Sequence, residues 1–288
     1  MLKNFLFNLL AMTILIVPAY AVETELPQNF KGFNLEGYEQ DGQKAWDVKG
    51  DTADIKGNTI LLTNIDANRY GNQEVNLKAK SGIVDKASGN IHLERDVIIT
   101  AKSGVKLTTD TLDWQKGKDL VSTDDKVFIK HEKMDATGTG LRAQPGLKLA
   151  QLNSNVTVKM NTEAAEKIPQ ILTITCDGPM EIDQLKNMAV FNKNVVAVQI
   201  GRELKADRME IYFDPQGKQI KEIICIGKVI ITQGENKTFA DKAVYNALEK
   251  KMTLSGRPKL IMITEGEGSI GFGDMMKSDK KEEPKDTR

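Results

Sequence analysis

The sequence predicts an all-β protein built from repeated antiparallel strand pairs. Apolar residues recur at every second position from about residue 31 onward, which is the period of half-buried strands. Gly, Asn, Asp and Pro separate these stretches at short intervals, as expected for turns. Helical periodicity is nearly absent, so an all-β fold is the class that fits all three observations.

Composition narrows the possible functions. The 288 residues are 40% hydrophobic and 28% charged, as in ordinary globular proteins. Forty basic residues balance forty acidic ones, so the chain lacks the basic footprint of a nucleic-acid-binding protein. It has two histidines, two cysteines and no Walker-type glycine loop, which argues against a zinc cluster or a nucleotide site. We therefore expect no cofactor, no metal and no nucleic-acid partner.

The N-terminal segment is typical of a secretory signal. Lys3 precedes the apolar run Phe5 to Val17, and Pro18 and the small residues of Ala19-Tyr20-Ala21 follow it. The run is shorter than the roughly 20 residues that a membrane-spanning helix needs. Residues 1–21 are thus predicted to be a signal peptide, with an uncleaved membrane anchor as the alternative. Either interpretation places residues 22–288 outside the cytoplasm.

The strands and turns follow one another along the whole chain. Clear alternation occurs in Val75–Ala79, Ile91–Leu93, Val156–Met160 and Met209–Phe213. Turn signals lie at Gly57-Asn58, Gly89-Asn90, Gly117-Lys118, Pro145-Gly146 and Asp214-Pro215-Gln216-Gly217.

One short helical turn is expected over Thr162–Lys167, and this segment stops before Pro169, which cannot continue a helix. A linker at residues 161–170 is predicted there. Residues 264–288 lose the alternation and end in a charged stretch, which predicts a disordered tail.

A short unit repeats through both halves of the chain. A small residue with polar neighbours begins each unit, and a valine follows 18 to 23 residues later. Each unit is one strand pair that cannot bury its apolar face alone, so stacking several units would create a shared interior. The small residues are Ala79, Thr109, Ala136, Cys176, Ala206 and Ala240, and the valines are Val97, Val127, Val156, Val195 and Val229.

The second half carries motifs of a known family. The stretch Thr175-Cys176-Asp177-Gly178-Pro179-Met180-Glu181-Ile182-Asp183 is followed by Ala189-Val190-Phe191-Asn192-Lys193-Asn194-Val195 and by Leu204-Lys205-Ala206-Asp207-Arg208-Met209-Glu210-Ile211-Tyr212-Phe213. These residues resemble the LptA type of the OstA-like family of periplasmic lipopolysaccharide-transport bridge proteins. The resemblance covers residues 171–263.

The first half is similar to the LptC type, through Phe33-Asn34-Leu35, Gly42 to Val48 with Trp46, and the repeats from Val75 to Met160. The expected organisation is therefore an LptC-like module at 22–160, the linker, an LptA-like module at 171–263 and the tail at 264–288. LptC-type proteins usually keep their N-terminal helix as a membrane anchor, whereas the helix here looks cleavable.

The resemblance implies two tandem OstA-like twisted β-jelly-rolls, each enclosing an apolar groove, and a non-enzymatic role in the periplasm. Lipopolysaccharide acyl chains would lie in the groove, and the energy would come from the inner-membrane Lpt ABC transporter. An outer-membrane Lpt assembly would receive the lipid, and modules would join edge to edge. Met209, Ile211 and Phe213 lie on one strand face, and they are our candidates for the groove lining together with Val195, Val229 and Ile231.

Alternatives remain open at this stage. A structural β-repeat protein of the cell envelope, with a closed interior, would show the same alternation. A hydrolase is disfavoured because the chain has no nucleophile elbow and no carboxylate pair. Cys176 and Cys225 could form a disulfide, although buried free thiols fit their apolar strands better. The recurring Ala206-Asp207-Arg208 and Ala240-Asp241-Lys242 favour a turn or bulge that redirects the strand rather than a catalytic role.

Overall fold

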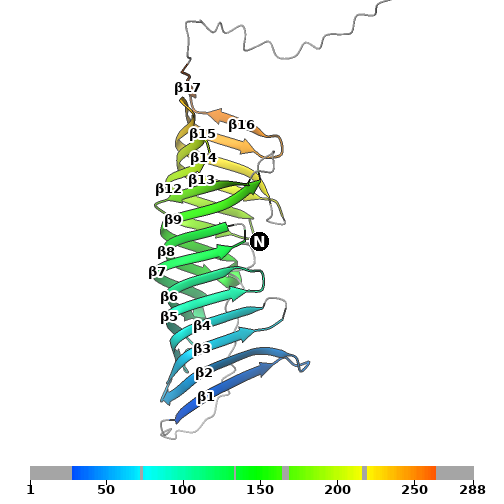
Figure 1. The fold of residues 1–288 in the computed structure, drawn as a ribbon, viewed down its shortest axis with the longest axis vertical. Helices are drawn as coiled ribbons and strands as arrows, with labels where there is room; N and C mark the ends of the chain where they lie inside the picture. The colour runs from blue at the N-terminus through cyan, green and yellow to red at the C-terminus, as the bar shows by residue number, and fades with distance from the viewer. Residues whose placement is uncertain (1–27, 72–73, 133, 164–168, 216–218, 264–288) are drawn as a thin grey trace, which may run out of the picture.

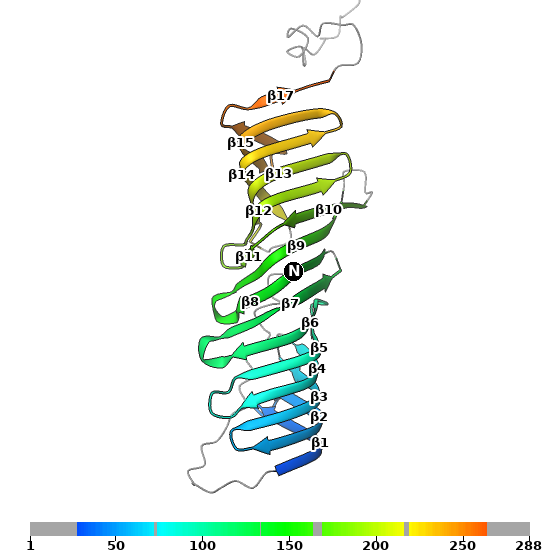
Figure 2. The same cartoon turned by 90° about the vertical axis from the view of Figure 1, so that its left-hand side faces the viewer.

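The computed structural model describes residues 28–71, 74–132, 134–163, 169–215 and 219–263. Within them, seventeen strands pair antiparallel in one continuous sheet, and most strands pair with their neighbours in the chain. Figures 1 and 2 show the strands stacked along the long axis of the molecule, from β1 at one end to β17 at the other. The all-β prediction is confirmed.

The first nine strands form the half nearer the N-terminus. They are β1 (Gln28–Tyr38), β2 (Lys44–Lys56), β3 (Thr59–Arg69), β4 (Val75–Asp85), β5 (Ile91–Ala101), β6 (Lys106–Gln115), β7 (Leu120–His131), β8 (Met134–Gln144) and β9 (Leu149–Glu163). Two 3₁₀ turns, Lys116–Lys118 and Pro145–Leu147, connect β6 to β7 and β8 to β9. Both turns coincide with predicted turn signals.

The remaining strands continue the stack. They are β10 (Pro169–Cys176), β11 (Met180–Asp183), β12 (Met188–Gln199), β13 (Arg202–Phe213), β14 (Ile220–Gln233), β15 (Asn236–Asn246), β16 (Lys251–Ser255) and β17 (Lys259–Ile261).

Most strands bend at an irregularity near their middle. The register shifts between Glu94 and Val97 in β5 and between Lys205 and Arg208 in β13. Such a bulge adds residues to one strand and turns its direction. The shift at Lys205/Arg208 encloses Ala206-Asp207-Arg208, and a second shift lies opposite Ala240-Asp241-Lys242. Of the turn or bulge expected at these motifs, the structure has a bulge in the strand that each motif faces. Asn192 and Val195 face Arg208 and Ala206, and Ile226 and Val229 face Lys242 and Ala240.

The bend divides the strands into two layers, which Figure 1 shows one behind the other. Strands β10 and β11 make the division visible, because together they fill one place in the stack. β10 pairs with residues 156–163 of β9, whereas β11 pairs with residues 149–152. β16 and β17 share β15 in the same way. Each long strand thus contributes one half to each layer.

The sheet is continuous through the predicted linker. Residues 161–163 belong to β9 and residues 169–170 to β10, and the two strands pair up to Glu163 and Pro169. The helical turn expected over Thr162–Lys167 is wrong for Thr162 and Glu163, which are in a strand. A helix of six residues is marginal by itself, and ladder hydrogen bonds to β10 stabilise the strand instead. Residues 164–168 lie outside the described part.

The apolar faces of the two layers form one core that runs the length of the stack. The five repeat valines are at most 1% exposed, and the small residues at the start of each unit are at most 8% exposed. Several of them are direct register partners across neighbouring strands: Val97 with Thr109, Val195 with Ala206, and Val229 with Ala240. A small residue opposite each valine lets the layers approach closely at the bend.

The predicted signal peptide and the predicted tail lie outside the described residues. In the described part, no helix has the length and apolar character needed to cross a membrane.

Candidate functional site

A chamber of about 620 Å³ lies between the two layers at the β1 end of the stack. Strands β1 to β6 supply its walls, and most of the lining side chains are aliphatic or aromatic. The lining residues are Phe30, Lys31, Gly32, Phe33, Asn34, Leu35, Trp46, Val48, Ala53, Ile55, Ile60, Leu62, Ile65, Ala67, Asn68, Arg69, Val75, Leu77, Val84, Lys86, Ile91, Leu93, Leu112 and Trp114. Its volume falls within the range of about 300–1,000 Å³ that is usual for ligand pockets.

Two aromatic side chains build the outermost wall by packing on glycines. Trp46 of β2 is the register partner of Gly37 of β1, and Phe33 of β1 is the partner of Gly50 of β2. A Cβ atom at either glycine would collide with the facing ring. Both glycines therefore leave room for a ring to cover the neighbouring backbone, as in aromatic rescue of edge glycines. The two rings become part of the chamber lining.

A polar cluster holds β1, β2 and β3 together beside the chamber. Asp47 is 1% exposed and accepts hydrogen bonds from Asn68 Nδ2 at 2.9 Å and from the Tyr70 hydroxyl at 2.7 Å. Lys44 Nζ lies 2.9 Å from Asp47 Oδ2, and it also pairs with Glu36 Oε1 of β1 at 2.8 Å. Burial raises the pKa of Asp47, but the hydrogen bonds from Asn68, Tyr70 and Lys44 outweigh this and lower the pKa to about 2. The carboxylate is thus charged and structural.

The residues that border the chamber include Lys31, Arg69 and Lys86 and no acidic residue. Asn34 and Asn68 also border it, but their side-chain amides donate to Glu36 and Asp47 in the polar cluster. Apart from these polar groups and Gly32, the walls are apolar. Apolar walls of this kind suit a ligand with alkyl chains.

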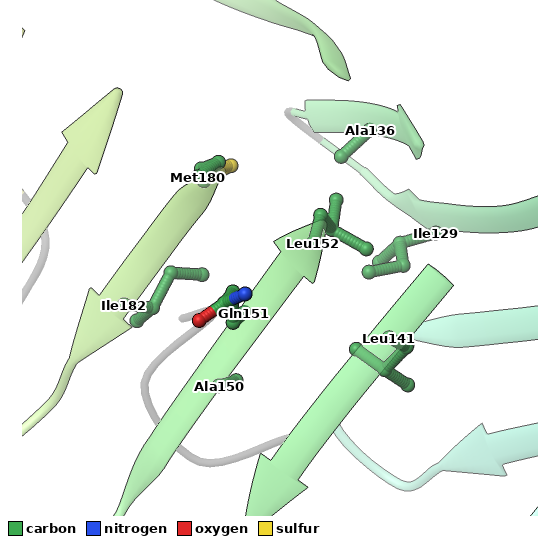
Figure 3. Close-up of a pocket in the computed structure, with 8 residues that line it drawn as sticks. All are labelled: Ile129, Ala136, Leu141, Ala150, Gln151, Leu152, Met180 and Ile182. Atoms are coloured by element: carbon green, nitrogen blue, oxygen red, sulfur yellow. The ribbon is translucent and has the colours of Figure 1, made fainter. Parts of the chain in front are cut away.

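Beyond the chamber the core is tightly packed. Val97, Ile99, Val105 and Leu107 are 0% exposed. A second pocket, of about 10 Å³, lies where β7, β8 and β9 meet β11. Figure 3 shows Met180 and Ile182 on one strand beside the side chains of the neighbouring strands that surround it. This pocket has room for about one water molecule, so the interior is closed at this level.

The six candidate groove residues all belong to the apolar interior. Val195, Met209, Ile211 and Val229 are at most 2% exposed, and Phe213 and Ile231 are partly buried against them. They come from β12, β13 and β14, and none of them lines the chamber. Their own side chains fill this part of the core. Lipid contact at these residues stays a prediction.

Sequence reasoning did not find the chamber itself. Trp114 belongs to the core and Trp46 packs against it, and both also form chamber walls. The usable signal was the pairing of glycines and aromatics in two adjacent predicted strands. Alternation alone does not show whether the space between two apolar faces is filled.

Other reactive side chains have structural surroundings. Cys176 and Cys225 are free and buried, as the free-thiol interpretation expected. His92 bridges two strands, with Nδ1 2.7 Å from Asp113 Oδ1 and Nε2 3.0 Å from Glu94 Oε1. In the described residues, no group of three or more His, Cys, Asp or Glu side chains could hold a metal ion.

Two family models match the chain one after the other. Residues 25–161 match the model described as lipopolysaccharide-assembly, LptC-related. Residues 174–284 match the model of the LptA/(LptD N-terminal domain) LPS transport protein. The chain combines an LptC-like module with an LptA-like module. The second match extends past residue 263, where the LptA-like resemblance was expected to end.

The solved structures that are similar to this chain include LptH, described as the LptA homologous periplasmic component of the conserved lipopolysaccharide transport device from Pseudomonas aeruginosa. It is 13% identical to this chain, covers 66% of this chain and 95% of its own, and superposes with a TM-score of 0.18. No curated protein sequence matches the chain. The two families give the chain a role in lipopolysaccharide transport, and both are families of transport components rather than enzymes.

Proposed function

We propose that the chain is a non-enzymatic bridge component of the periplasm that shields lipopolysaccharide acyl chains between its two layers. It would receive the lipid from the inner-membrane Lpt ABC transporter and pass it towards the outer-membrane Lpt assembly. The chamber of about 620 Å³ at the β1 end carries this proposal, because it is an apolar space large enough for alkyl chains.

Shielding needs no catalytic group. Burying one methylene of an acyl chain contributes about 0.8 kcal/mol, so partial insertion of a chain already opposes its return to water. In the described part of the chain, apolar side chains line the chamber and no group of side chains forms an evident reaction centre. Energy for directed transport would come from the transporter.

The two ends of the stack support edge-to-edge association with partner modules. β1 pairs with β2 alone, and β16 and β17 pair with β15 alone, among the described residues. Phe30 and Leu35 of β1 are about half exposed, and so are Leu260 and Ile261 at the other end. Unpaired strand edges with exposed apolar side chains accept a further strand readily. Each end is therefore proposed to dock a Lpt module or a second copy.

Onward movement requires the packed core to open. The layers of β12 to β14 would separate as lipid advances, which brings Val195, Met209, Ile211, Phe213, Val229 and Ile231 into contact with it. This step explains how the candidate residues can be both core and groove.

The deciding experiment uses two adjacent leucines on opposite faces of β3. A photocrosslinking residue replaces Leu62, which lines the chamber, or Leu61, which is 36% exposed on the other face. We expect adducts with purified lipopolysaccharide at Leu62 and none at Leu61. A second pair, Ile211 and Glu210, reports on the packed half. Absence of adducts at both Leu62 and Ile211 in folded protein would favour the structural protein with a closed interior.

A further inference from the structure

We infer that one edge of the stack binds the surface of an anionic lipid bilayer through three consecutive turns, which connect β6 to β7, β8 to β9 and β11 to β12. Four lysines and two leucines of these turns form what we call the basic ridge: Lys116, Lys118, Leu147, Lys148, Leu185 and Lys186. The inference concerns the outer surface of the molecule and does not depend on the chamber, so it goes beyond the proposed function.

The three turns are hydrogen-bonded to one another. Gly146 N donates to Asp119 Oδ2 at 2.6 Å, which joins the β6–β7 turn to the β8–β9 turn. Gln184 N donates to Lys148 O at 3.2 Å, which joins the β8–β9 turn to the β11–β12 turn. Figure 2 shows these turns following one another along one side of the stack. Neighbouring turns are two strand spacings apart, so the ridge extends over about 20 Å.

The two leucines of the ridge lie in the turns and are largely exposed. Leu147 is 55% exposed and Leu185 is 68% exposed. Each is followed directly in the chain by an exposed lysine, Lys148 or Lys186. An apolar side chain beside a lysine can enter the boundary between head groups and acyl chains while the ammonium stays among the head groups. The two Leu-Lys pairs therefore have the composition of a bilayer contact.

The acidic side chains of these turns already have partners within the chain. Asp119 binds the backbone of the next turn, as described above. Asp183 Oδ1 accepts the backbone N–H of Lys186 at 3.0 Å, and its other oxygen lies 3.0 Å from Lys186 Nζ. The Lys186 side chain is 71% exposed, and a single ion pair at such a site is weak, so its ammonium can exchange this partner for a lipid phosphate.

The other three lysines of the ridge are exposed, and within the described part of the chain none of them forms an ion pair: Lys116, Lys118 and Lys148. Their charge is available to an anionic surface. A lysine near such a surface contributes about fivefold to binding, and four together give a contact that salt should weaken.

The opposite edge of the stack has the opposite charge. Forty basic and forty acidic side chains balance in the whole chain, so the excess of lysine on the ridge reflects their distribution. A bilayer with anionic lipids would attract the ridge and repel the other edge, which would orient the molecule. The described turn residues of that other edge include one lysine and five acidic residues: Lys102, Glu39, Asp41, Glu74, Glu132 and Glu235.

A bilayer fits this surface better than a small anion does. The ridge consists of exposed turns, and none of its six residues lines either of the two pockets described above. A small anion would therefore stay in water, whereas an extended surface can contact three neighbouring turns at once.

The test measures flotation of the chain from Val22 onward with lipid vesicles, because the apolar run before Pro18 would insert by itself. The vesicles contain phosphatidylcholine with or without phosphatidylglycerol, and no lipopolysaccharide is present. We expect binding to vesicles with phosphatidylglycerol to exceed binding to phosphatidylcholine alone at least tenfold, and added salt to reduce the difference.

Two variants that lose the same number of charges separate the ridge from the rest of the surface. The loss of the four ridge lysines should weaken binding about a hundredfold or more. The loss of four exposed strand lysines outside the ridge should leave binding close to that of the parent chain. The ridge variant combines Lys116→Gln, Lys118→Gln, Lys148→Gln and Lys186→Gln, and the control combines Lys49→Gln, Lys80→Gln, Lys106→Gln and Lys130→Gln.

A second comparison tests the leucines. Leu147→Gln together with Leu185→Gln should weaken binding about tenfold and leave its salt dependence unchanged. Ile200→Gln is the control, because Ile200 is 81% exposed in the β12–β13 turn of the opposite edge and should not affect binding. Unfolding midpoints confirm that each variant is folded.

Equal binding to the two kinds of vesicle, or equal losses in the two lysine variants, would overturn the inference. Self-association in sedimentation velocity that the ridge variant abolishes, without vesicle binding, would assign the ridge to a second copy and would also overturn it. Lipopolysaccharide adducts at Leu62 report on the chamber, so the proposed function and this inference can fail independently.

Discussion

Val156 of β9 and Cys176 of β10 are register partners across the boundary between the LptC-like and LptA-like modules. They are 1% and 4% exposed, so the pair is part of the core. The same valine-to-small-residue pairing occurs within each module, for example between Val195 and Ala206. The boundary therefore repeats the contact that stacks strands inside a module, and the two modules share one interior.

The close contact of Gly178 with β9 should make it intolerant of a side chain. Gly178 has φ +104°, and an added Cβ would collide with the backbone of Asn153 and Ser154. We expect Gly178→Ala to destabilise the protein by about 2 kcal/mol or more, measured by urea unfolding. Gly201→Ala is the control, because Gly201 has φ +75° with open space around it and should cost about 1 kcal/mol. Equal losses would show that the contact with β9 is unimportant.

Truncating a side chain in the chamber wall should lower the free energy of unfolding less than truncating one in the packed core. Leu107 is 0% exposed, so Leu107→Ala should cost about 2–5 kcal/mol. Leu62 already borders empty space, and Leu62→Ala should cost about 1–2 kcal/mol. The two free energies of unfolding are compared under identical conditions. A larger loss at Leu62 than at Leu107 would mean that the chamber is filled in solution.

Asp47 should stabilise the protein in a defined acidic range. Its pKa of about 2 in the folded chain is below its ordinary value of 3.8, so its contribution is complete above about pH 4 and is lost as the pH falls towards 2. The amount is on the order of 2 kcal/mol. Asp47→Asn should flatten the dependence of the unfolding free energy on pH between 4 and 2. Asp135→Asn, at an exposed site on β8, should leave the slope unchanged.

His92 should act in the opposite direction. The bond to Asp113 raises its pKa above 6.5, burial opposes this, and the bond to Glu94 adds to it. Its contribution to stability is therefore complete below pH 6.5 and declines as the pH rises through the raised pKa. The effect should be small, because the ring is 34% exposed. The thermal midpoint of the His92→Gln variant should not decline over this pH range, whereas that of His131→Gln should decline as in the parent protein.

The cysteine thiols should be unreactive in the folded protein. Burial raises the pKa of Cys225 to about 12 and also raises that of Cys176, so little thiolate exists at neutral pH. Titration with a thiol reagent should give almost no reaction in buffer and two thiols per chain after unfolding without a reductant. No thiols after unfolding would show that the two cysteines form a disulfide in solution.

Strands, turns and repeat positions were predictable because each depends on residues close together in the chain. Alternation indicates which side of a strand is apolar, so the candidates from Val195 to Ile231 were correctly expected on the interior face. The recurrence of one motif indicated a turn or bulge at Ala206 and Ala240, and a bulge faces each of them on the neighbouring strand. The helical turn at Thr162 failed because pairing with β10 overrides a weak local preference.

The location of the empty space needed the folded layers. Ile211 and Ile91 both lie in clearly alternating stretches of the sequence, yet Ile211 is buried in the packed core and Ile91 lines a chamber of about 620 Å³. The difference depends on how far apart the layers lie and on which side chains meet from distant strands, such as Trp46 and Trp114. Periodicity in the chain is enough to decide which face is apolar, but packing across the two layers decides whether that face is filled, because volume is shared by residues that are far apart in the sequence.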